Sequence, residues 1–202
     1  MTFVRGALLA LSATLLAGMM WHEAQACACC TSSGERTDLV MPLSSSYADE
    51  FSQVRFEPAA QLFLGEAEPE SVKGIKTPAE KYNLQAAWLK DQFVFAFRDE
   101  ADRAGTLALA RPKTLSIFHV DPREGTPPPG RGPSLYKEWR ITAKAKGTGI
   151  FTPGLGAAQT LTLVLQGRGN NCTSANDFTH WMLVMWGPKT KYHFFGNLIT
   201  TR

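Results

Sequence analysis

The stretch Leu135–Lys146 reads LYKEWRITAKAK and decides the fold class. Apolar and polar residues alternate along it. One face carries Leu135, Trp139, Ile141, Ala143 and Ala145, and the other carries Tyr136, Glu138, Arg140, Thr142, Lys144 and Lys146. A period of two is typical of an antiparallel strand with one face in the core and the other in water. We therefore predict a half-buried strand here.

Further segments on both sides of this strand show the same pattern and are separated by turn residues. They are Tyr82–Leu89, Gln92–Arg98, Thr106–Ala110, Lys113–Val120, Thr160–Gln166, Phe178–Trp186 and Lys191–Ile199. The connections Lys90-Asp91 and Gly187-Pro188-Lys189-Thr190 are short enough for hairpins. Short strands at this spacing predict an all-β, mainly antiparallel sandwich or barrel in a single domain.

Three segments between the strands have a different character. Pro122–Ser134 is rich in proline, which cannot donate a backbone hydrogen bond to a sheet, so we expect an exposed loop. Glu66–Pro78 is predicted to be a second loop. Asp99–Ala104 is predicted to form a short helix.

The beginning of the chain has the three parts of a secretory signal peptide. Arg5 precedes the apolar run Gly6–Met20, and Ala24-Gln25-Ala26 fits the signal peptidase site. We therefore expect a signal peptide at 1–26, a cysteine-rich segment at 27–47 and the antiparallel β domain at 48–202. The expected location is the periplasm or the exterior of the cell.

An attachment to the membrane is the alternative for this amino-terminal region. Gly6–Met20 is shorter than the roughly 20 apolar residues that a spanning helix needs. Cys27 stands at the cleavage point, where a lipid could be attached. Ala24, however, holds the place at which a lipidation signal has a large aliphatic residue. We expect contact with a membrane only if Cys27 is lipidated.

The charge pattern argues against nucleic acid as a partner. The net charge is only +3, and binding to nucleic acid needs basic residues gathered on one face. The longest basic grouping is Lys137, Arg140, Lys144 and Lys146 on one segment. We interpret it as a solvated strand face.

The cysteines are the most informative remaining residues. Cys27, Cys29 and Cys30 lie close together, and Cys172 lies far away in a loop rich in Gly and Asn. In an oxidising compartment two disulfides are expected, and every pairing joins Cys172 to one member of the cluster. The other two cysteines can then only pair as near neighbours, and the ring is strained and reducible when the pair is Cys29–Cys30. Purely structural disulfides remain one interpretation.

A soft-metal site is the other interpretation of the cluster. Cys27, Cys29 and Cys30 place three sulfurs within one turn, and thiolates select Cu(I) and Zn(II). A structural zinc site needs four ligands, which only Cys172 or a histidine could complete. Cu(I) needs fewer, so copper fits the cluster better than zinc. A thiol-disulfide exchange role is weaker, because the usual C-x-x-C motif stands at a helix start within a βαβ pattern, and this sequence shows neither.

The other metal-ligating side chains fit the core or the surface of the sheet. His119, His180 and His193 each fall on a predicted strand. His180 and His193 become cross-strand neighbours in one register of the last hairpin and are separated if 180 pairs with 197. Met182 and Met185 should point to opposite faces of their strand. The side chains of Phe93, Phe95 and Phe97 share one face and are predicted to be core.

No catalytic motif stands out, and we assign no catalytic residue. Ser174, Asp177 and His180 are close in sequence, but a triad is defined by its geometry. Asn171-Cys172-Thr173 matches the glycosylation sequon. The sequence thus predicts an exported soft-metal-binding protein, with Cu(I) before Zn(II). The alternatives are a barrel or sandwich that binds a small molecule and an interaction protein whose disulfides are structural.

Overall fold

The computed structural model describes residues 34–64, 72–123, 134–154 and 159–200. Ten strands and one α-helix follow one another along this part of the chain. They are β1 (Arg36–Pro42), α1 (Ser45–Gln53), β2 (Ala59–Leu62), β3 (Lys81–Trp88), β4 (Gln92–Arg98), β5 (Ala104–Ala110), β6 (Thr114–Val120), β7 (Leu135–Gly147), β8 (Thr160–Gly169), β9 (Phe178–Gly187) and β10 (Thr190–Asn197). Two 3-10 helices, η2 (Gly149–Gly154) and η3 (Ala175–Asp177), complete the list.

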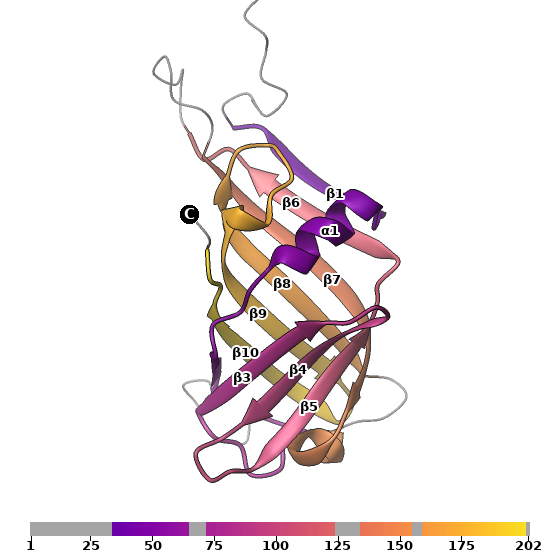
Figure 1. The fold of residues 1–202 in the computed structure, drawn as a ribbon, viewed down its shortest axis with the longest axis vertical. Coiled ribbons are helices and arrows are strands. Elements are labelled where there is room, and N and C mark those ends of the chain that lie inside the picture. Colours follow the sequence, from indigo (N-terminus) through magenta and orange to yellow (C-terminus); the bar gives the residue numbers. More distant parts are fainter. Residues whose placement is uncertain (1–33, 65–71, 124–133, 155–158, 201–202) are drawn as a thin grey trace, which may run out of the picture.

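Eight of these strands close into an antiparallel barrel (Figure 1). Their order is β7-β5-β4-β3-β2-β10-β9-β8, and β8 pairs back onto β7 from Thr160 to Gly169. The barrel confirms the predicted antiparallel all-β fold and selects the barrel over the sandwich. Closure leaves none of these eight strands as a free sheet edge, which is one way in which β proteins avoid unwanted pairing.

The long strand β7 belongs both to the barrel and to an extension of the sheet. Ala145–Gly147 pairs with β5, whereas the earlier part, 136–140, pairs with β6. β6 pairs in turn with β1 along the whole of that strand. The strands β3, β4 and β5 therefore wall one end of the barrel, and at the other end α1 lies in front of β7 and β8 (Figure 1).

The helix α1 covers the barrel core with one aromatic side. Ser44 begins the helix as its N-cap, since the Ser44 side chain accepts from the N–H of Tyr47. Phe51 is buried and stacks on Trp88, with a ring-centre distance of 5.8 Å. Phe51 and Tyr47 both contact Trp139, which points inward from β7. The helix thus packs over the end of the barrel at which Trp139 lies.

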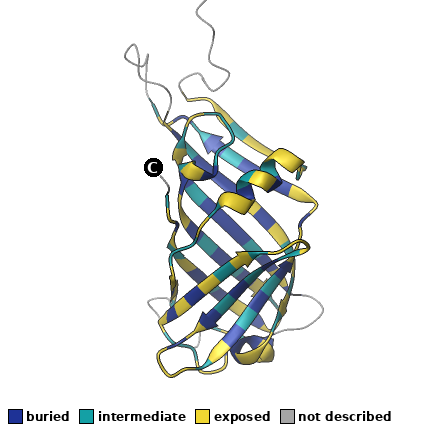
Figure 2. Cartoon of the chain, in the orientation of Figure 1, coloured by how far each residue is buried: buried dark blue, intermediate teal, exposed yellow. Residues whose placement is uncertain are grey.

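Side chains fill the barrel interior. Buried and exposed residues alternate along the strands, as the striped pattern in Figure 2 shows. The largest buried side chains come from opposite walls and include Phe95, Phe97, Phe151, Trp181 and Phe194. An eight-stranded barrel is just wide enough for side chains to fill it. The interior is therefore a hydrophobic core, and Phe93, Phe95 and Phe97 belong to it as predicted.

The structure corrects two predictions and adds elements that the sequence pattern did not indicate. Asp99–Ala104 is a tight turn and not a helix, because Asp99 Oδ1 accepts from the N–H groups of Ala101 and Arg103. Lys137 is not on a solvated face, since its side chain points into the barrel. The added elements are β1, α1 and β2, and β1 lies inside the range 27–47. Most of Pro122–Ser134 and the first part of Glu66–Pro78 lie outside the described residues.

Candidate functional site

Of the predicted metal and disulfide residues, Cys172 is the one that the structure describes. Cys27, Cys29 and Cys30 lie outside the described residues. Cys172 lies between β8 and η3 and is disulfide-bonded. Its N–H donates to Asn170 Oδ1 at 2.9 Å, and its carbonyl accepts from Lys137 Nζ at 2.6 Å. The backbone of Cys172 is therefore held from two sides.

Lys137 anchors the segment that carries this cysteine, which we call the cysteine loop (residues 170–177). The Lys137 side chain is only 4% exposed, and its Nζ donates to Asp177 Oδ2 at 2.5 Å as well as to Cys172. The same ammonium lies 6.0 Å from the centre of the Phe178 ring. A buried charge is tolerated only with partners of this kind. Lys137 thus ties β7 to both ends of the cysteine loop.

The cysteine loop is also held by α1 and by close packing on β8. The N–H of Ala175 donates to Glu50 Oε2 at 2.6 Å. A Cβ added at Gly169 would lie 2.1 Å from the carboxyl carbon of Asp177, and one at Gly167 would lie 1.9 Å from the Asp177 carbonyl oxygen. Only glycine allows the loop to come so close to β8. The loop therefore presents Cys172 from a fixed position.

A second buried titratable group lies beside Lys137. His119 points inward from β6 and is the cross-strand partner of Lys137. Burial lowers the pKa of His119, and the positive charge of Lys137 lowers it further, whereas Glu35 acts in the opposite direction. The end of the barrel near the cysteine loop therefore favours a neutral imidazole beside one buried ammonium.

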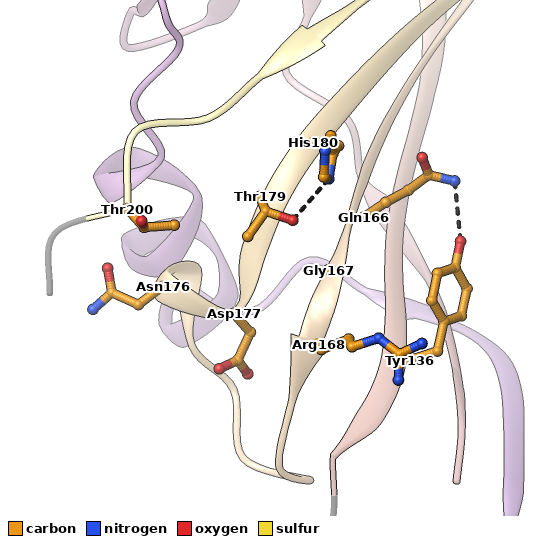
Figure 3. Close-up of a pocket in the computed structure, with 9 residues that line it drawn as sticks. All are labelled: Tyr136, Gln166, Gly167, Arg168, Asn176, Asp177, Thr179, His180 and Thr200. Carbon is orange, nitrogen blue, oxygen red and sulfur yellow. Dashed lines mark hydrogen bonds between the residues drawn. The ribbon is translucent and has the colours of Figure 1, made fainter. Parts of the chain in front are cut away.

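The outer wall next to the cysteine loop is hollowed (Figure 3). The hollow has a volume of about 600 Å³. Its lining comes from β7, β8, β9, the cysteine loop and the segment after β10: Tyr136, Gln166, Gly167, Arg168, Asn176, Asp177, Thr179, His180 and Thr200. A bulge in β9 shapes it, because Gln166 pairs with His180 while the next residue, Gly167, pairs with Phe178. Thr179 is the extra residue. Bulges turn side chains in this way, and Thr179 and His180 are both exposed between two buried neighbours.

A polar network on β7 forms one wall of this hollow. Tyr136 donates to Glu138, and Gln166 Nε2 donates to Tyr136 Oη and to Glu138 Oε1, each at 3.0 Å. Burial and the bond to Glu138 raise the pKa of Tyr136 to about 12. Burial opposes ionisation of Glu138, but the hydrogen bonds from Tyr136, Gln166 and Arg140 outweigh it and hold the pKa of Glu138 below its usual range. The network is fixed and keeps Tyr136 protonated.

The histidines and the suggested triad do not come together. In the last hairpin His180 pairs with Asn197 and His193 with Val184, which is the separated register. Asp177 bonds to Lys137, and His180 Nδ1 bonds to Thr179 Oγ1 at 2.8 Å. Within residues 34–64, 72–123, 134–154 and 159–200 no group of three His, Cys, Asp or Glu side chains could hold a metal ion.

The methionines of β9 lie on opposite faces, as predicted. Met185 is fully buried in the core, while Met182 is partly exposed on the outer wall. The two sulfurs therefore cannot bind the same metal ion unless the strand rearranges.

Comparison with known proteins gives no relative from which a role could be transferred. No protein-family model matches the chain, and neither curated proteins nor solved structures give a match. Among the described helices none has the length and apolar character to cross a bilayer. The chemistry must therefore be argued from the residues themselves.

Sequence reasoning missed the buried Lys137 and the outer hollow for different reasons. Lys137 stands between Leu135 and Trp139, so the period of two itself places it on the apolar face, and this signal was available. The hollow depends on the bulge at Thr179. The sequence Phe178–Trp181 gives no sign that two consecutive side chains point outward.

Proposed function

We propose that this chain is an exported soft-metal-binding protein whose ligands are Cys27, Cys29 and Cys30, with Cu(I) preferred to Zn(II). The barrel serves as the scaffold. The observation that carries the proposal is the anchored, disulfide-bonded Cys172. A bridge from Cys172 to the amino-terminal cluster would bring the cluster to the fixed cysteine loop, and no other cysteine occurs in the sequence.

Counting the sulfurs explains why the bridge supports metal binding. If Cys172 takes one member of the cluster, the other two have no distant partner. The adjacent pair Cys29–Cys30 would form a strained ring, which is easily reduced. A soft ion bound by both thiolates relieves that strain. Cu(I) is held by thiolates at low coordination numbers, whereas a structural zinc site asks for four ligands.

The filled barrel interior weakens the alternative of a ligand in the barrel mouth. Phe51 on α1 and Trp139 and Phe178 at the same end of the barrel occupy the space that such a ligand would need. The remaining alternative is a protein whose four cysteines form structural disulfides. The two proposals differ in one measurable property, the number of free or easily reduced thiols.

The test is an anaerobic Cu(I) titration of the chain that begins at Cys27, after mild reduction that leaves the Cys172 bridge intact by intact mass. We expect about one Cu(I) per chain, with affinity rising with pH as the thiols lose protons. The variant Cys29→Ser/Cys30→Ser should lose this binding and keep its β-rich circular dichroism spectrum. Met182→Leu is the matched control, because Met182 is a soft ligand on the barrel wall and should be irrelevant.

Two results would overturn the proposal. One is unchanged copper binding by the Cys29→Ser/Cys30→Ser variant. The other is a mature protein in which mild reduction frees no thiol and the parent binds no Cu(I). The second result would establish the structural-disulfide alternative.

A further inference from the structure

The hollow of Figure 3 is one of two that adjoin on the outer wall. The second has a volume of about 340 Å³ and lies over β9 and β10, where its lining includes Met182, Phe195, Asn197 and the carboxylate of Glu57, which accepts from Asn197 Nδ2 at 3.2 Å. Gln166 and His180 line both hollows. The two hollows therefore adjoin along the outer wall between the cysteine loop and β10.

The charges in the hollow beside the cysteine loop favour a negatively charged ligand. Arg168 is exposed in the first hollow, and its side chain has no ion pair or hydrogen bond with any of the described residues. The one carboxylate of that hollow, Asp177, is bonded to the ammonium of Lys137 from the inner side of the sheet. A cation thus finds the carboxylate already neutralised, whereas an anion finds a guanidinium whose donors no described residue occupies.

The hydrogen-bond geometry supplies a second donor beside the shared boundary. The bond between Thr179 Oγ1 and His180 Nδ1 holds the imidazole ring on the outer face. When the Thr179 hydroxyl donates to His180 Nδ1, the neutral ring carries its proton on Nε2. This N–H can donate a hydrogen bond to a ligand. The hydrogen bond from Gln166 to Tyr136 fixes the part of the lining that lies between the two donors, Arg168 and His180.

The geometry points to a binding site for a small organic oxyanion, with its phosphate or carboxylate group on Arg168 and its carbon body over Met182 and Phe195. Arg168 provides the planar fork that matches an oxyanion. Phe195 is 39% exposed on this wall, and a carbon body would cover it. The site is distinct from the cysteine cluster and needs no metal.

The site is tested with phenyl phosphate and inorganic phosphate as probes, by calorimetry and by amide chemical shifts. The parent should bind both in the millimolar range or tighter and should prefer phenyl phosphate. Arg168→Gln should weaken both by about tenfold or more. Phe195→Ser should remove the preference for phenyl phosphate and leave the affinity for inorganic phosphate unchanged. Benzoate and acetate repeat the comparison for a carboxylate head group.

The matched control is Lys144→Gln, which also removes one positive charge from the outer wall. Lys144 lies on β7 opposite Thr160, away from the hollow. It should bind as the parent does. Equal losses in Arg168→Gln and Lys144→Gln would show general charge attraction and overturn the site. Parent-like binding by Arg168→Gln, no preference for phenyl phosphate, or no binding of either probe by the parent would overturn it as well.

Discussion

Lys137 and Asp177 are 40 residues apart in the sequence, and the 2.5 Å bond between Lys137 Nζ and Asp177 Oδ2 joins the interior of the barrel to the cysteine loop. The same ammonium holds the carbonyl of Cys172. One side chain therefore serves strand β7, the loop and the disulfide together. A purely apolar core would not need Lys137. Its removal should therefore disturb the cysteine loop before the rest of the barrel.

We expect Lys137→Met to destabilise the protein by about 3 kcal/mol, because it leaves the largely buried carboxylate of Asp177 without its counter-charge. Urea unfolding gives the value. Lys144→Met removes an exposed lysine of the same strand and should change stability by no more than about 0.5 kcal/mol. The double variant Lys137→Met/Asp177→Asn should cost less than the two single changes added together. Additive costs would show that the pair does not act as a unit.

The glycines of β8 provide a test of how closely the cysteine loop must approach. Gly167→Ala should cost about 3 kcal/mol, since its new methyl would meet backbone atoms of Asp177. Gly169→Ala should cost less, about 1 to 2 kcal/mol, because it meets the Asp177 side chain, which can turn away at the expense of the bond to Lys137. Thermal unfolding of both variants checks the order. The reverse order would contradict the packing described for the loop.

The stability should fall as the pH drops below about 6.5, for a reason that lies in His119. Burial and Lys137 hold the pKa of His119 below its ordinary value of 6.5, so the unfolded chain takes up a proton before the folded chain does. The loss begins near pH 6.5 and stops once the pH passes the folded-state pKa. His193 adds a loss of the same sign, because burial and Lys191 lower the pKa of its imidazole too.

Urea unfolding across this pH range measures the effect. His119→Asn and His193→Asn should each flatten the profile, and the double variant should flatten it further. A profile that keeps its slope in the double variant would exclude these two imidazoles as the cause. Comparing the slopes of the unfolding free energy against pH also separates the pH effect from a pH-independent loss of stability that the substitutions cause through packing.

The repeating strands were predictable from the sequence because their burial follows the period of two. Gln92–Arg98 and Leu135–Lys146 are strands in the structure, and the predicted bounds agree within one residue. β2 was not predictable in this way, since four residues are too short for a pattern, although β2 closes the barrel between β3 and β10. The edge strand β1 shows no alternation either, because five of its seven residues are exposed.

The candidate site was less predictable because it depends on contacts between distant segments. Asp99 illustrates the difficulty on a small scale. Its carboxylate closes the turn between β4 and β5. The polar stretch Asp99–Ala104, which resembles the start of a helix in sequence, is therefore the turn of a hairpin. In the same way, nothing near Cys172 in the sequence indicates that Lys137 and Glu50 hold its loop. The cysteine pattern indicated a special region, and the structure shows how the barrel holds its one described member.

The helix α1 should contribute to stability mainly through Phe51. Phe51→Ala removes a side chain that is 2% exposed and packed between Trp88 and Trp139, so we expect a loss of about 3 to 4 kcal/mol in urea unfolding. Ser52→Ala, at the next and exposed position, is the control and should cost less than about 1 kcal/mol. Equal losses would mean that α1 is not packed on the barrel as described.

The disulfide of Cys172 should contribute most of its stabilisation through the length of chain that it closes. A bridge to the amino-terminal cluster closes a loop of more than a hundred residues, for which the chain-entropy estimate gives an upper value of roughly 5 kcal/mol. We expect Cys172→Ser to lose a few kcal/mol in urea unfolding and full reduction of the parent to lose the same amount. The single variants Cys27→Ser, Cys29→Ser and Cys30→Ser then identify the partner, because one of them should reproduce the loss while the other two stay near the parent, and peptide mapping of the oxidised protein should name the same cysteine. If Cys172→Ser is as stable as the parent under oxidising conditions, the bridge does not hold the amino terminus on the barrel, and the metal site proposed for the cluster loses its scaffold.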